Sequence, residues 1–177
     1  MPTAILSALS QEQQGLIELL RQPRRVTHAG REFWLGDLHG QPVVLALSKI
    51  GKVAAATTTA VLIERFAARR IVFTGVAGGL GTDVHVGDVV VASDFVQHDL
   101  DASPLFPRYE VPLYGKTRLE SDAALTALLF NAPCAAMAGG PVSPAYPKAR
   151  IHCGLIASGC RFVCGAVGPR PLTTHLE

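Results

Sequence analysis

Short apolar runs alternate with amphipathic stretches along most of the chain, a pattern typical of strands that alternate with helices. The runs at residues 71–74 and 89–93 are continuously apolar and rich in valine, as expected of strands buried on both faces. Residues 31–38 and 42–48 flank His39-Gly40, which is a hairpin signal. A short strand is predicted to begin at residues 5–6. Further strands are predicted at residues 31–38, 42–48, 71–74, 89–93 and 151–158.

Three segments have a helical pattern. The first is expected to begin at Ser10, whose hydroxyl would cap it with Gln13 three residues later, and to end near Leu20 before Pro23. The second, residues 53–67, is apolar nearly all round and should pack closely against a sheet or a partner subunit. The third runs from Ser121 or Asp122 to Leu129, after a long loop at residues 99–118 that contains three prolines. These elements predict the α/β class.

Composition narrows the function. With 177 residues, 49% hydrophobic and 17% charged, the chain is expected to form one domain over residues 1–167, followed by an unstructured tail at 168–177. A net charge of +2 from scattered basic residues argues against nucleic-acid binding. The absence of a leader or a long apolar run argues against a membrane protein and favours the cytoplasm. Four cysteines without paired C-x-x-C spacing indicate reduced thiols and no metal site.

A glycine-rich stretch follows the buried strand at 71–74 and contains Gly75, Gly78, Gly79 and Gly81. Glycines let a backbone approach a planar or anionic group closely, so this stretch is interpreted as the floor of a small-molecule site. Its spacing is not that of a dinucleotide-binding fingerprint, and it lacks the lysine of a phosphate-binding P-loop. A simple bulge between core strands stays open as an alternative.

Five segments in succession match one known family. They are residues 50–56 (IGKVAAA), 74–80 (TGVAGGL), 86–91 (VGDVVV), 98–101 (HDLD) and 154–159 (GLIASG). In this order the chain resembles the 5'-methylthioadenosine/S-adenosylhomocysteine nucleosidases of the nucleoside phosphorylase superfamily, over roughly residues 4–167. The resemblance implies an α/β fold with a central mixed, twisted sheet flanked by helices. It also implies a homodimer, no cofactor, and hydrolysis of the N-glycosidic bond that releases adenine in methionine salvage.

The resemblance assigns roles to individual residues. Glu12 matches the carboxylate that activates the attacking water; from the residues alone it would be a solvated acid favoured by a helix N-terminus. Leu9 and Ile50 match apolar positions of the ribose and base pocket. Ala77 and Gly78 match the backbone beside adenine, and Val76 stands there where the family usually has serine.

The other implied contacts lie later in the chain. Phe162 and Val163 match the pair that stacks on the purine and reads its edge, although a lone phenylalanine after a strand is more often part of a core. The loop around Leu105, Phe106 and Pro112 matches the segment that covers the 5'-alkylthio group across the dimer interface; an ordinary surface loop is the alternative.

The chain departs from the family after Val167. The family's Met-Glu pair, which holds the ribose hydroxyls, and its Ser-x-Asp segment, which supplies the general acid, have no counterpart, and Cys160 replaces a usual aspartate. A truncated or frameshifted member without the family's C-terminal strand and helix is therefore expected, with impaired activity. Two alternatives stay open: a non-catalytic remnant that binds adenine nucleosides or dimerises, and a purine nucleoside phosphorylase.

Overall fold

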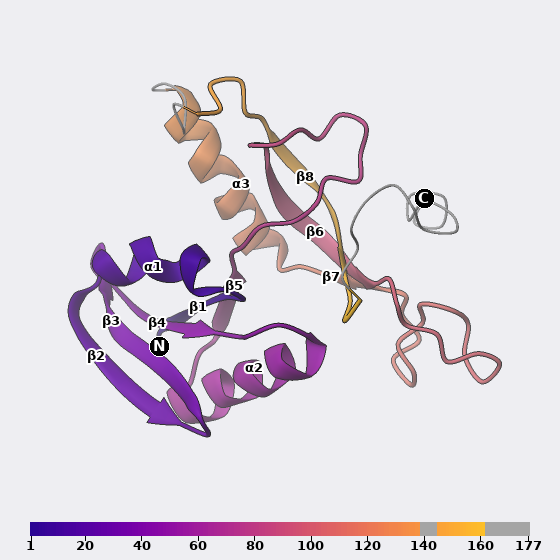
Figure 1. The fold of residues 1–177 in the computed structure, drawn as a ribbon, viewed down its shortest axis with the longest axis horizontal. Helices are drawn as coiled ribbons and strands as arrows, with labels where there is room; N and C mark the ends of the chain where they lie inside the picture. The colour runs from indigo at the N-terminus through magenta and orange to yellow at the C-terminus, as the bar shows by residue number, and fades with distance from the viewer. Residues whose placement is uncertain (139–144, 162–177) are drawn as a thin grey trace. The chain divides into compact units, whose positions relative to one another are not determined.

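A computed structural model describes residues 1–138 and 145–161 (Figure 1). The chain divides into two compact units, Met1–Ala77 and Gly78–Glu177. Both units combine helices with a mixed sheet, which confirms the predicted α/β class. The predicted tail at 168–177 lies outside the described residues, and the predicted extent of a single domain stays a prediction.

The first unit contains a five-stranded sheet in the order β2-β3-β4-β1-β5. Its strands are β1 (Thr3–Ser7), β2 (Arg21–His28), β3 (Arg31–Leu38), β4 (Gln41–Leu47) and β5 (Arg70–Phe73). The strands β2, β3 and β4 pair antiparallel, whereas β1 pairs parallel with both β4 and β5. The predicted hairpin and the predicted strands at the chain start and at 71–74 are confirmed. The expected burial of the run at 71–74 on both faces was wrong, because β5 is the edge strand of this sheet and Phe73 is 57% exposed.

The strand β2 was not predicted, because its residues were interpreted as the end of a helix and a turn. Nearly all its side chains are exposed, so it has no apolar alternation, and it contains Pro23. Proline is tolerated at a sheet edge, where its missing N–H interrupts no ladder. The pairing with β3 also shifts register between Arg21 and Arg24. The sequence signal for this strand was therefore weak.

Two helices cover the sheet, α1 (Ser10–Glu18) and α2 (Lys52–Phe66). The predicted cap of α1 was wrong: Leu9 is the N-cap residue, and the Ser10 hydroxyl bonds to the Gln11 side chain instead. The carboxylate of Glu12 accepts a hydrogen bond from the Leu9 backbone N–H at 2.9 Å. The start of α1 is therefore closed by an acid in its first turn. The helix α2 matches its prediction to within one residue at each end.

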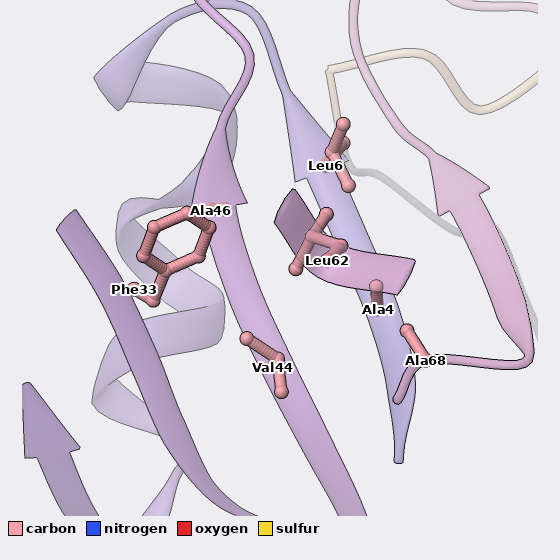
Figure 2. Close-up of a cluster of buried hydrophobic side chains, with 7 residues drawn as sticks. All are labelled: Ala4, Leu6, Phe33, Val44, Ala46, Leu62 and Ala68. Carbon is pink, nitrogen blue, oxygen red and sulfur yellow. The ribbon is translucent and has the colours of Figure 1, made fainter. Parts of the chain in front are cut away.

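The two helices pack on opposite faces of the sheet. Successive side chains of a strand point to opposite faces, and those of β4 alternate between a cluster with α2 and a cluster with α1. Figure 2 shows the cluster that includes Val44 and Ala46 of β4 together with Leu62 of α2. Its buried members are Ala4, Leu6, Phe33, Val44, Ala46, Leu62 and Ala68. Val43 and Leu45 belong to a second cluster, against which Leu16 and Ile17 of α1 pack. The sheet is thus the middle of three layers.

Three buried hydroxyl groups lie where β1 and β4 end. The Ser48 hydroxyl lies within hydrogen-bond distance of two carbonyl oxygens, those of Ser7 and Lys49, to which it can donate. The Thr58 hydroxyl of α2 donates to the Ala54 carbonyl at 2.9 Å. Ser7 is fully buried, and among the described residues its Oγ is the one buried side-chain polar atom that makes no hydrogen bond. An unsatisfied buried hydroxyl is unfavourable for folding.

We expect Ser7→Ala to raise the free energy of unfolding by about 1 kcal/mol, because it removes an unsatisfied buried group. Urea unfolding followed by circular dichroism measures the effect. The matched control is Ser48→Ala, which removes a bonded hydroxyl and should lower the stability. Equal losses in both variants would contradict the prediction.

In its described residues, the second unit has a three-stranded sheet in the order β7-β6-β8, with one helix against it. Its elements are β6 (Val89–Gln97), β7 (Arg118–Glu120), α3 (Ala123–Ala138) and β8 (Ile151–Ser158). The strand β6 runs parallel to β8 and antiparallel to β7. The predicted strand at 151–158 is confirmed, and β6 extends four residues beyond the predicted 89–93. The expected burial of 89–93 on both faces was wrong, because Val91 is buried but Val89 is exposed. The strand β7 was missed because its three residues are all exposed.

The helix α3 continues past the predicted end at Leu129 and has Pro133 inside it. Its first turn is tied to the sheet, because Ser121 Oγ and Thr126 Oγ1 both donate to the Ala92 carbonyl. The predicted loop at 99–118 contains no helix and one isolated bridge, between Val111 and Lys116. Within the described parts of the chain, no helix is both long and apolar enough to span a bilayer.

A buried carboxylate joins the starts of β6 and β8. Asp88 is 3% exposed and accepts hydrogen bonds from the backbone N–H of His85 and of Arg150, at 3.0 and 2.7 Å. Its Oδ2 also lies 2.9 Å from His152 Nε2. These hydrogen bonds, led by that from His85, favour the charged form and hold the pKa of Asp88 far below its ordinary value of 3.8. We call this arrangement the Asp88 clasp.

The lowered pKa predicts a dependence of stability on pH. The stabilisation is complete above the pKa that the carboxyl has in the unfolded chain and declines as the pH falls below about 3.8 toward the folded-state value. We expect Asp88→Asn to lower the urea midpoint at pH 7 and to flatten its decline between pH 4 and 2. Asp83→Asn removes a nearby exposed charge outside the clasp and is the control. An unchanged pH profile in Asp88→Asn would refute the role of the clasp.

Candidate functional site

The carboxyl ends of β1, β4 and β5 meet at one edge of the first sheet, because β1 pairs parallel with both neighbours. The pairing continues beyond the strands: Ser48 N–H donates to the Ser7 carbonyl and Thr74 N–H to the Leu6 carbonyl, each at 2.8 Å. In open α/β sheets, ligands bind outside the carboxyl ends of parallel strands. The segments 8–12, 48–51 and 74–77 all start from this edge.

The carboxylate of Glu12 connects two of these segments. Its Oε2 accepts hydrogen bonds from the backbone N–H groups of Ala8 and Leu9, both at 2.9 Å, after β1. Its Oε1 accepts one from the N–H of Val76 at 3.0 Å, after β5. Because backbone donors fix both oxygens, the carboxylate is preorganised at the strand ends. We call this arrangement the Glu12 clamp.

Gly75 makes room for the Glu12 clamp. A Cβ atom at residue 75 would lie 2.8 Å from Glu12 Oε1 and 3.2 Å from its Cδ, closer than such atoms approach. The glycine was expected to allow a close approach to a ligand, whereas the close approach that the structure describes is to this carboxylate. A Cβ at Gly78, in contrast, would have nothing within 4 Å. Gly75 is thus a site residue to which the sequence analysis gave no role beyond membership of the glycine-rich stretch, although its position directly after the apolar run at 71–74 was a signal.

The apolar site residues of the first unit surround the same strand ends and are open to solvent. Leu9 is 40% exposed, Ile50 79% and Val76 84%, and Ala77 is also exposed. Ile50 follows Lys49, whose backbone is in the left-handed region with φ +62°. Exposed apolar side chains at the carboxyl ends of these strands would be available to contact an apolar group of a ligand.

The remaining predicted residues belong to the second unit. Gly78 and Leu105 are both exposed, with Leu105 at 84%. Phe162 and Val163 lie outside the described residues. The segment before them is tied to β6: Asp99 accepts a hydrogen bond from the Cys160 N–H at 2.7 Å, and a Cβ at Gly159 would collide with His98. His98-Asp99 thus positions the chain after β8.

Two depressions in the second unit contain none of the predicted site residues. One, of about 490 Å³, lies beside α3 and includes Cys153, and the other, of about 510 Å³, includes His85, Tyr146 and Arg150. Cys134 and Cys153 carry free, exposed thiols. Over residues 1–138 and 145–161, no group of three or more His, Cys, Asp and Glu side chains is placed to hold a metal ion.

Comparison with known proteins agrees with this geometry. The family model described as the phosphorylase superfamily matches residues 2–169. A 5'-methylthioadenosine/S-adenosylhomocysteine nucleosidase of Shewanella sediminis (strain HAW-EB3) is 34% identical over 99% of this chain and 72% of its own length. An aminodeoxyfutalosine nucleosidase of Campylobacter jejuni is 31% identical over 93% of this chain and 67% of its own length.

Solved structures agree as well. The Neisseria meningitidis 5'-methylthioadenosine/S-adenosylhomocysteine nucleosidase in complex with methylthio-immucillin-A superposes with a TM-score of 0.86 at 34% identity, covering 99% of this chain and 71% of the other. A mutant nucleosidase of Helicobacter pylori with 5'-methylthioadenosine in its active site superposes with a TM-score of 0.81 at 30% identity. The match covers 93% of this chain and 67% of the other.

The fold and the site define a class of protein: an α/β protein with a carboxylate held at the carboxyl ends of its parallel strands. The chain belongs to the phosphorylase superfamily and, within it, to the family of the 5'-methylthioadenosine/S-adenosylhomocysteine nucleosidases.

The Glu12 clamp makes a steric prediction. We expect Gly75→Ala to lower the free energy of unfolding by about 1–3 kcal/mol, since the added methyl group displaces the carboxylate, the movable end of the Glu12 side chain, from its backbone hydrogen bonds. Exchange of the Val76 amide hydrogen should also become faster, because its bond to Glu12 is displaced. Gly78→Ala adds the same methyl group in open space and is the stability control. If both variants are equally stable, the close approach does not constrain residue 75.

Proposed function

We propose that this protein hydrolyses the N-glycosidic bond of 5'-methylthioadenosine and S-adenosylhomocysteine and releases adenine, as a step of methionine salvage. The single observation that carries the proposal is the Glu12 clamp, which fixes a carboxylate at the strand ends. The family supports the substrate class, because the relatives at 34% identity are nucleosidases for these two compounds.

Glu12 is the residue proposed to activate water. An ionised carboxylate has about four acceptor positions. The three backbone N–H groups leave acceptor capacity for a water molecule. Hydrolysis of an N-glycoside passes through an oxocarbenium-like transition state, in which a water held by a carboxylate attacks the sugar carbon as the base departs. Glu12 would orient this water and accept its proton, and the departing adenine would take up a proton from the solvent.

The surrounding residues are proposed to hold the nucleoside. Leu9 and Ile50 would contact the ribose and the base, which matches their exposed apolar side chains, and Val76 would lie beside adenine where the family usually has serine. The backbone at Ala77 and Gly78 would lie beside adenine. Leu105, Phe162 and Val163 complete the proposed set: Leu105 covers the 5' substituent, and the other two contact the purine by stacking and backbone hydrogen bonds.

A homodimer in the cytoplasm is also proposed. Its support is the exposure of large apolar side chains on α2 and on the loop after β6. These are Val53 (79% exposed), Ile63 (47%), Leu105 (84%) and Leu113 (91%). A second copy that covers these side chains would remove them from water, which stabilises association.

Adenine release from purified protein tests the proposal. Wild-type protein is incubated with 5'-methylthioadenosine, S-adenosylhomocysteine or aminodeoxyfutalosine, with and without phosphate, and adenine is measured by chromatography. We expect release that does not require phosphate and that falls about a hundred- to ten-thousand-fold in Glu12→Gln. Glu18→Gln, which neutralises an exposed acid of the same helix, is the matched control and should keep wild-type activity.

The other outcomes separate the alternatives. Release that requires phosphate would identify a nucleoside phosphorylase, to which the superfamily match also extends. Binding of the nucleoside without any release would identify a non-catalytic adenine-nucleoside-binding protein. Either result would overturn the proposed hydrolysis.

A further inference from the structure

Helix α1, which carries Glu12, has few apolar attachments to the sheet. Gln13 is its one fully buried residue, at 2% exposed, while Leu16 and Ile17 are only half-buried. A nine-residue helix has little intrinsic stability, so contacts with the sheet must fix its orientation. The sole fully buried contact is made by an amide side chain.

The buried amide of Gln13 is bonded to the centre of the sheet. Its Nε2 donates to the Ala46 carbonyl at 3.0 Å. Ala46 is 1% exposed and lies in β4, directly opposite Leu6 of the parallel neighbour β1. Polar groups in a core are stabilising only when they are paired, so this hydrogen bond is costly to lose.

We infer that Gln13 is a positioning residue for Glu12, an inference that rests on the proposed role of Glu12 in hydrolysis. Neighbouring side chains of a helix point about 100° apart, as 3.6 residues complete a turn. Glu12 therefore attaches the first turn of α1 to the ends of β1 and β5, and Gln13 attaches it to β4 in a second direction. Two attachments in different directions prevent rotation of the helix about its axis.

This second attachment matters when Glu12 acts on water. When Glu12 takes a proton from the water, its carboxylate becomes a weaker hydrogen-bond acceptor, so its own hold on the strand ends weakens. The hydrogen bond of Gln13 does not change during the reaction and keeps the Cα atom of Glu12 in place. A reacting group displaced by about 1 Å can lose up to a hundredfold in rate.

Gln13→Met tests the inference, because methionine has a similar length and volume but no amide. We expect kcat for adenine release to fall about tenfold, as misplacement affects the reacting geometry. The KM should stay within about twofold, since Gln13 makes no proposed contact with the nucleoside. The matched control is Gln14→Met, the same change at the exposed neighbouring position, which should leave both parameters unchanged.

A second readout is independent of activity. In the substrate-free protein, exchange of the amide hydrogens of Ala8, Leu9 and Val76 should become about tenfold faster in Gln13→Met, while amides in the centre of β4 keep their protection. A uniform acceleration would indicate general destabilisation and overturn the inference. If Gln13→Met does not fold, Gln13→Leu is measured in the same way.

The two readouts distinguish the two claims. If wild-type protein releases no adenine, the proposed function fails, and the exchange rates still decide whether Gln13 positions the Glu12 clamp. If wild-type protein is active but Gln13→Met keeps its kcat or the wild-type exchange rates at Ala8, Leu9 and Val76, the positioning role is wrong and the function stands.

Discussion

The parallel pairing of β1 with both β4 and β5 is the constraint on which the proposed site depends. It directs three chain segments to one edge of the sheet, where the amides of residues 8, 9 and 76 converge on one carboxylate. Without this pairing, Glu12 would be an exposed acid at a helix start. The charge alone is common on protein surfaces, whereas three backbone donors from two strand ends require this topology.

The sequence predicted most of the first sheet, because its strands bury apolar side chains. Val43 to Ala46 stand out for that reason. The run at 71–74 was recognised by its apolar residue types, although Phe73 is exposed, whereas β2 has neither signal, because an exposed edge strand needs no apolar alternation. The N-cap of α1 was predicted one residue late. Ser10 has the residue type of a cap, but the tertiary contacts of Glu12 determined the geometry at Leu9.

Only part of the candidate site could be predicted from the sequence. Family motifs pointed to Glu12, but nothing local to the sequence could show that Gly75 lies against it, because the two are more than 60 positions apart and meet only through β1 and β5. Gln13 was interpreted as part of a capping box at the surface. Its burial follows from the packing of α1 over β4, which no pattern of residue types in a short helix specifies.

The Asp88 clasp has a consequence for how the second unit forms. Asp88 and Arg150 are 62 positions apart along the chain, so pairing of β6 with β8 closes a long loop that includes β7 and α3. Closing a long loop costs chain entropy that local contacts do not recover. We therefore expect the β6–β8 pair to form more slowly than a local hairpin such as β3–β4, because contacts between distant segments pay the closure entropy first.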